Sequence, residues 1–140
     1  MQRECLNCGQ GKLVHAVRDV PYGYKGHQTV IPQVKGWHCP HCREVEFAAG
    51  EGTRFAETIS RFAAEIDVQE AAELARIRKK LKLTQQEAAQ LTGGGPNAFS
   101  RYERGKAKPV QAVTNLFKLL DRHPDLLREL RPTFSTKAGK

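Results

Sequence analysis

The sequence predicts an α+β chain in which a small β-rich N-terminal domain precedes an all-α C-terminal domain. All four cysteines fall within the first 42 residues, where they form two closely spaced pairs. The residues between the pairs read as strand-forming segments around a turn-rich segment. From residue 55 onward, apolar residues recur at helical spacing. These three observations divide the chain into a β part and an α part.

The two cysteine pairs have the spacing of metal ligands. In Cys5-x-x-Cys8 and Cys39-x-x-Cys42, two residues between thiols let both sulfurs of one turn face a single centre, and two such turns complete a tetrahedral site. The sequence therefore predicts one structural Zn²⁺ per chain, bound by Cys5, Cys8, Cys39 and Cys42. A site closed by four thiolates has no open position for catalysis.

Other roles for the four cysteines are less favoured by the sequence. A reducing cytosol disfavours disulfides, and a redox pair would need a single CxxC in a βαβ setting. Iron stays open, because four thiolates also suit a rubredoxin-type site. Rubredoxins usually have glycine after the second pair, where this chain has Arg43. His38 and His41 flank the second pair, and with four thiols available we expect neither to bind metal.

The stretch between the pairs predicts a β-hairpin and hence a zinc-ribbon-like module. Residues 12–20 read as a strand, 21–26 as a turn and 28–31 as the start of a returning strand. Its expected core is small, so the metal should supply much of its stability. The apolar residues assigned to that core are Val14, Val17, Val20, Val30, Val34 and Trp37.

A helix should connect the hairpin to the C-terminal domain. Its apolar stripe follows helical spacing and is expected to pack on the ribbon; it consists of Phe55, Ile59, Phe62 and Ile66. Asp67 and Glu70 have capping-box spacing, which predicts that a new helix starts near residue 68. The predicted domains are 1–67 and 68–131, followed by a disordered tail at 132–140.

The second half predicts a helix-turn-helix domain of the lambda-repressor-like kind. Thr84 to Glu87 is a capping box that opens a short helix, and the glycines at 93–95 break it. A third helix follows over 97–103 and ends at Gly105. Further helices are expected from Pro109 and from Pro124. The last of these helices has more apolar surface than a small core needs, in Leu126, Leu127 and Leu130. This surplus predicts a two-fold dimer contact.

The third helix has the features of a recognition helix. Phe99 and Tyr102 are spaced as core anchors, whereas Asn97 and Arg101 share another face and can read adenine and guanine edges. Asn97 could instead cap the helix, and Arg101 could instead pair with Glu103 or Glu87. The candidate contacts to the DNA backbone are Thr84, Gln85, Gln86, Ser100 and Arg104.

Charge supports a polyanionic partner for the second half. The chain has a net charge of +8, of which residues 1–66 contribute +1 (eight Lys/Arg, seven Asp/Glu) and residues 67–140 contribute +7 (15 Lys/Arg, eight Asp/Glu).

We find no paired carboxylates, no nucleophile with a base and no phosphate-binding loop, and therefore expect no enzyme. No apolar run is long enough to span a bilayer, and the expected location is the cytoplasm.

Several motifs together resemble the MqsA family of antitoxins from bacterial type II toxin–antitoxin systems. The resemblance runs from about residue 3 to 131, and its most specific part is the triple-glycine turn followed by NAFSRYE. The motifs are Cys5-x-x-Cys8-Gly, Asp19-Val-Pro-Tyr22, Gly36-x-x-Cys39-x-x-Cys42, Leu83-Thr-Gln85 and Gly93-Gly-Gly-x-Asn-Ala-Phe-Ser-Arg-Tyr-Glu103.

The resemblance implies that the zinc domain binds and neutralises an mRNA-cleaving toxin. It also implies that a dimeric C-terminal domain binds a palindromic operator, represses its own operon and associates with the nucleoid when bound. The family's zinc ligands fall on the four cysteines, and its base-reading residues fall on Asn97 and Arg101. The sequence leaves two alternatives open. The first is a stand-alone zinc-ribbon helix-turn-helix regulator without a toxin partner, and the second, less favoured, is an iron electron-transfer protein fused to a DNA-binding module.

Overall fold

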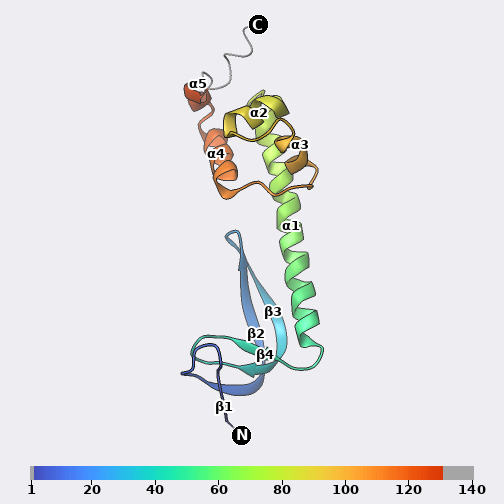
Figure 1. Cartoon of the computed structure of the whole chain (residues 1–140), viewed down its shortest axis with the longest axis vertical. Coiled ribbons are helices and arrows are strands. Elements are labelled where there is room, and N and C mark those ends of the chain that lie inside the picture. Colours follow the sequence, from blue (N-terminus) through green and yellow to red (C-terminus); the bar gives the residue numbers. More distant parts are fainter. Residues whose placement is uncertain (1, 131–140) are drawn as a thin grey trace. The chain divides into compact units, whose positions relative to one another are not determined.

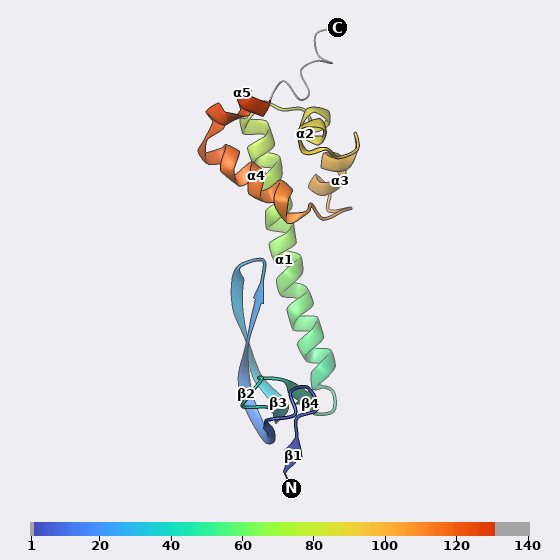
Figure 2. The ribbon, with the colours of Figure 1, turned by 60° about the vertical axis from the view of Figure 1, so that its left-hand side comes forward.

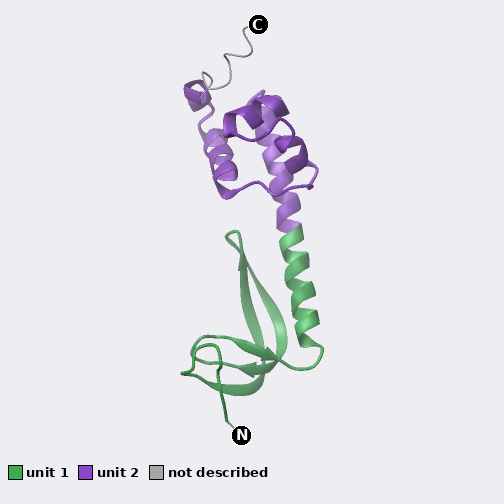
Figure 3. Cartoon of the chain, viewed as in Figure 1, with its two compact units in different colours: residues 1–64 green, residues 65–140 purple. Residues whose placement is uncertain are grey.

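A computed structural model describes residues 2–130, and the chain divides into two compact units, residues 1–64 and 65–140 (Figure 3). Unit 1 contains a four-stranded antiparallel sheet, and unit 2 is helical. The predicted α+β class is confirmed. The tail predicted at 132–140 lies outside the described residues. Within those residues, none of the helices has both the length and the apolar character needed to cross a bilayer.

The sheet of unit 1 is built around one long hairpin, which twists along its length (Figures 1 and 2). Its strands follow the chain order β1-β2-β3-β4. They are β1 (Arg3–Glu4), β2 (Lys12–Tyr24), β3 (His27–His38) and β4 (Val45–Phe47).

Strand β2 extends further than predicted, because residues 21–24 belong to the strand and not to the turn. Pro21 pairs with Val30, and the hairpin turns only at Lys25 and Gly26. A proline fits here because β1 reaches only residues 12 and 13 of β2, which leaves that edge of the strand unpaired further on.

A bulge interrupts the hairpin at Asp19. The register shifts between Arg18 and Val20, and Gln33 on the opposite strand adopts a left-handed backbone with a φ of 52°. The backbone N–H of Gln33 donates to the Asp19 carboxylate at 2.9 Å, so the bulge has a side-chain partner of its own.

The first turn of helix α1 (Glu51–Lys80) braces the same bulge. Arg54 donates to the carbonyl oxygens of Pro32 and Gln33, at 3.0 and 3.2 Å. Glu51 accepts the Lys35 N–H at 2.8 Å and pairs with Arg54 at 2.9 Å. The Arg54 guanidinium and the Lys35 N–H lower the pKa of Glu51 to about 2.

Most of the valines predicted for the ribbon core are exposed. Val14, Val17 and Val30 are 43%, 53% and 55% exposed, whereas Val34 and Ile31 are fully buried. In an antiparallel pair, opposite residues share a face. Val34 pairs with Arg18, and Val17 pairs with the neighbouring Lys35, so Val17 lies on the other face. The predicted packing of the α1 stripe is observed in two ring contacts, Phe47–Phe55 and Tyr22–Phe62.

Helix α1 is continuous, so the prediction of a new helix near residue 68 is wrong. The 28 residues after Gly52 contain neither glycine nor proline, and nothing in them stops the helix. Asp67 uses its carboxylate for an ion pair with Lys108 at 3.2 Å. Capping-box spacing is therefore insufficient evidence for a helix start.

The helices of unit 2 surround one core. After α1 come α2 (Gln85–Thr92), α3 (Ala98–Glu103), α4 (Gln111–Arg122), the 3₁₀ turn η1 (Pro124–Leu126) and α5 (Leu127–Leu130). Phe99 of α3 and Phe117 of α4 are fully buried, with ring centroids 5.1 Å apart. Helix α4 begins two residues after Pro109, with Val110 as its cap.

The three leucines of the last helical segment belong to this core. Leu127 is buried, and Leu126 and Leu130 are partly buried against the same cluster. Part of the apolar surplus from which the sequence predicted a dimer contact is therefore used within the unit. Leu126 and Leu130 keep part of their surface exposed, and the dimer contact stays a prediction.

Candidate metal centre and nucleic-acid interface

The fold brings the four cysteine sulfurs together in unit 1. All four lie within 4.8 Å of one another; Cys5 and Cys42 sulfurs are 3.6 Å apart, and Cys8 and Cys39 sulfurs are 3.8 Å apart. A tetrahedral ion with bonds of about 2.3 Å to sulfur requires sulfurs about 3.8 Å apart. The Cys5–Cys42 and Cys8–Cys39 separations match this value, and the four sulfurs are close enough to surround one metal ion.

The two cysteine turns have the same backbone design. In the first, the Gly9 N–H donates to the Cys5 carbonyl at 2.8 Å; in the second, the Arg43 N–H donates to the Cys39 carbonyl at 3.0 Å. Gly9 and Arg43 occupy equivalent positions, and both have a φ of 67°. Each turn thereby points two sulfurs at the centre.

Hydrogen bonds from the turns favour the thiolate form that binds metal. The Asn7 side chain donates to the Cys42 sulfur at 3.5 Å, which lowers the pKa of Cys42 to about 6. The backbone N–H groups of residues 10 and 11 lower the pKa of Cys8. The Cys8 N–H lowers the pKa of Cys5, but burial and the neighbouring Cys42 sulfur outweigh it and raise that pKa to about 11.

Gly11 is a residue of this centre that the sequence analysis missed. A Cβ at this position would overlap the Cys39 sulfur, so the backbone passes too close to the sulfurs for any side chain. The only feature of the sequence that could have pointed to Gly11 is its closeness to Cys8 and Gly9. His38, which flanks Cys39, is buried and hydrogen-bonds through Nε2 to the Val34 carbonyl at 3.0 Å, while His41 is exposed.

In unit 2, α2 and α3 form a helix-turn-helix. The Thr84 hydroxyl accepts the Glu87 N–H at 3.0 Å, and the Glu87 carboxylate accepts the Thr84 N–H at 2.9 Å, which completes the predicted capping box. Helix α2 ends at Gly93 in the left-handed conformation, with a φ of 77°. A conformation that favours glycine thus sets the turn before α3.

Helix α3 presents Asn97 and Arg101 to solvent and turns Phe99 inward. Asn97 is at the N-cap position, but its side chain makes no capping hydrogen bond. The two glutamates proposed as partners of Arg101 are engaged elsewhere, Glu103 by Arg78 and Glu87 by Thr84. Among the described residues, the Arg101 guanidinium has no hydrogen bond or ion pair.

The five candidates for contact with the DNA backbone differ in exposure and in whether their side chains are already hydrogen-bonded. The Gln85 side chain donates to Glu103 at 3.1 Å, and the Thr84 hydroxyl is used in the capping box. Gln86 is exposed, Ser100 is half-buried, and Arg104 is exposed with its Nε donating to the Ser100 carbonyl at 3.2 Å.

A buried ion pair fixes α3 against α1. Arg78 donates to both carboxylate oxygens of Glu103, at 2.6 and 3.0 Å, and to the Leu83 carbonyl at 2.9 Å. The side chains of Arg78 and Glu103 are only 12% and 11% exposed. The sequence contains no signal for this pair, because nothing local links Arg78 to a residue 25 positions away.

These features define a class of protein: a β-module with four cysteines clustered at metal-binding distance, joined in one chain to a helix-turn-helix module. A family model described as "Antitoxin component of bacterial toxin-antitoxin system, MqsA" matches residues 3–131. Antitoxin MqsA of Escherichia coli (strain K12) is 40% identical over 130 residues, which cover 91% of this chain and 99% of that protein. The chain belongs to the MqsA family of antitoxins.

The chain is also similar to a solved structure of the N-terminal domain of the E. coli protein MqsA. It is 31% identical in sequence, with a TM-score of 0.41, over 46% of this chain and 96% of that chain.

Proposed function

We propose that this antitoxin has two binding activities, one in each unit. Unit 1 holds one structural Zn²⁺ with its four cysteines, and it binds and neutralises a cognate mRNA-cleaving toxin. Unit 2 binds a palindromic operator as a homodimer and represses the chain's own operon. Both activities belong to the cytoplasm, at the nucleoid when operator is bound, and neither requires the chain to be an enzyme.

The observation that carries the DNA-binding part is that Asn97 and Arg101 are both exposed at α3. Asn97 does not cap the helix, and the glutamates that could have paired with Arg101 have other partners. A recognition helix presents its N-terminal residues to base edges in the major groove. There, asparagine pairs with adenine N6 and N7, and arginine grips guanine O6 and N7.

Zinc is favoured for the metal because it prefers tetrahedral thiolate ligands, and the sulfur spacing suits it. The bound ion would hold both cysteine turns together and supply no chemistry. A colourless purified protein with one zinc per chain would support zinc over iron.

Replacing Asn97 or Arg101 by alanine should weaken operator binding by about 1–3 kcal/mol each, roughly 5- to 150-fold, with little change on unrelated DNA. The measurement is fluorescence anisotropy on a duplex from the chain's own promoter and on a scrambled duplex of equal length, at one salt concentration. Arg104→Ala is the control, because a backbone contact should weaken both duplexes alike. An equal loss on both duplexes for Asn97→Ala and Arg101→Ala would assign these residues to the DNA backbone instead.

Toxin neutralisation should require an intact unit 1 and should not require the contacts of Asn97 and Arg101 with DNA bases. The test is co-expression with the small protein encoded by the neighbouring gene. We expect the wild-type chain and the Asn97→Ala, Arg101→Ala double variant to restore growth equally, whereas Cys39→Ser should fail because it breaks the metal centre. If the wild-type chain does not restore growth, the stand-alone regulator becomes the better description.

A further inference from the structure

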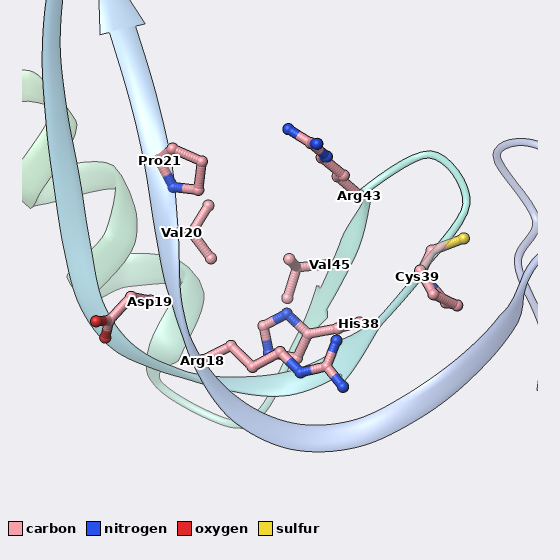
Figure 4. A pocket seen from close by; sticks show the side chains of 9 residues that line it. Arg18, Asp19, Val20, Pro21, His38, Cys39, Arg43 and Val45 are labelled. Atoms are coloured by element: carbon pink, nitrogen blue, oxygen red, sulfur yellow. The ribbon is translucent and has the colours of Figure 1, made fainter.

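Unit 1 contains a pocket of about 520 Å³ that borders the metal centre at Cys39 and has no role in the proposed metal binding or DNA binding. Arg18 lies at its base beside His38, and Arg43 lies across from them on the loop after the second cysteine pair (Figure 4). Val20, Pro21 and Val45 form apolar walls between the two arginines. The pocket therefore combines two cations with an apolar lining.

Neither of these arginines is neutralised. Among the described residues, the side chains of Arg18 and Arg43 make no ion pair or hydrogen bond, whereas Arg3 pairs with Glu46 and Arg54 pairs with Glu51, each at 2.9 Å. The acid next to Arg18 is Asp19, but its carboxylate points away from the pocket and accepts the Gln33 N–H (Figure 4). Two unpaired guanidinium groups thus line one pocket.

The backbone at Arg43 suggests that its side chain is used. Arg43 stands where the first cysteine turn has Gly9, with the same φ of 67°. L-residues rarely adopt this conformation, and glycine adopts it freely. An arginine at this position gives the turn no conformational advantage, whereas it does bring a cation to the pocket.

The charge of unit 1 decides between classes of ligand. A nucleic acid needs an extended positive surface, but residues 1–64 have eight Lys/Arg and six Asp/Glu and carry a net charge of only +2. Guanidinium groups bind a carboxylate through paired hydrogen bonds, which strengthen where apolar walls exclude water. The pocket suits a single carboxylate whose aliphatic stem contacts the valines and the proline.

We infer that this pocket receives one acidic side chain, Asp or Glu, of the toxin, clamped between Arg18 and Arg43. The inference rests on the proposed function, in which unit 1 binds the toxin. Arginines that accept a desolvated partner charge are commonly among the few residues on which an interface depends. Arg18 and Arg43 should then act together.

The test is isothermal titration of the full-length zinc-loaded chain with the protein encoded by the neighbouring gene. The variants are Arg18→Met, Arg43→Met and the double variant, with Lys12→Met as a control that removes one exposed positive charge from β2. Each single variant should weaken binding about tenfold or more. The double variant should lose less than the product of the two single losses, because both arginines hold one carboxylate.

The possible outcomes separate the inference from the proposed function. If the wild-type chain does not bind the protein, both are overturned. If it binds, but Arg18→Met and Arg43→Met lose no more than Lys12→Met, only the pocket assignment is overturned. A zinc competition assay on every variant completes the test: unchanged zinc affinity with weakened toxin binding supports the inference. A loss of zinc affinity in parallel with toxin affinity would mean that the arginines offset the negative charge of the thiolates, and would overturn it.

Discussion

Removing the metal should unfold unit 1 and leave the helices of unit 2 folded. The buried cluster beside the proposed metal centre of unit 1 consists of Cys5, Leu13 and Cys39, so two of its three buried members are proposed ligands. Such a small core cannot hold two turns together when four thiolates repel one another. Unit 2 has its own cluster of eleven buried residues, to which no metal contributes.

The two units can be followed separately in the intact chain. Trp37 is the single tryptophan and packs against the Cys5–Leu13–Cys39 cluster, so its fluorescence reports on unit 1. On chelation, or in Cys39→Ser, we expect the Trp37 emission to shift to that of an exposed indole, while helical circular dichroism and operator binding are largely retained. Zinc should reverse the effect of chelation and not that of the substitution. Collapse of operator binding on chelation would contradict the independence of the units.

The sequence was most informative where function depends on local spacing. Two CxxC turns need only two intervening residues each, and the Thr84 capping box spans four residues, so short-range patterns contain the whole signal. Asn97 and Arg101 could likewise be placed on one helix face from their spacing. Gly11 was missed, because its requirement comes from a sulfur 28 positions later in the chain.

Features that depend on distant partners could not be predicted. The faces of the hairpin depend on the bulge at Asp19, whose partners lie on β3 and on the first turn of α1. Alternation alone therefore put Val17 and Val30 in the core, although both are exposed. Asp67 looked like a helix cap, because the sequence does not reveal its ion pair with Lys108.

Replacing Arg78 by methionine should lower the free energy of unfolding of unit 2 by about 3–5 kcal/mol, because it leaves the Glu103 carboxylate buried without its partner. The measurement is urea denaturation followed by circular dichroism, with Trp37 fluorescence monitoring unit 1 separately. Arg76→Met is the matched control: Arg76 also bridges helices, through Glu73 and Asp121, but it is 49% exposed, so the change should be much smaller. Equal losses for the two variants would show that Arg78–Glu103 behaves as a surface pair.

The stability of unit 2 should depend on pH in opposite directions in the wild type and in Arg78→Met, which a packing defect alone would not produce. In the wild type, burial raises the pKa of Glu103, but hydrogen bonds from Arg78 and Gln85 outweigh it and hold the pKa below its usual range. The stability from this pair is therefore present above the unfolded pKa of about 4.3 and is lost as the pH falls through the lower folded value. In Arg78→Met, burial is opposed only by the Gln85 hydrogen bond and the charge of Lys79, and the folded pKa should rise above the unfolded one. The variant should then lose stability as the pH rises from the unfolded pKa of about 4.3 through the raised folded value. If Arg78→Met instead parallels the wild type at every pH, the loss comes from packing and not from an uncompensated charge.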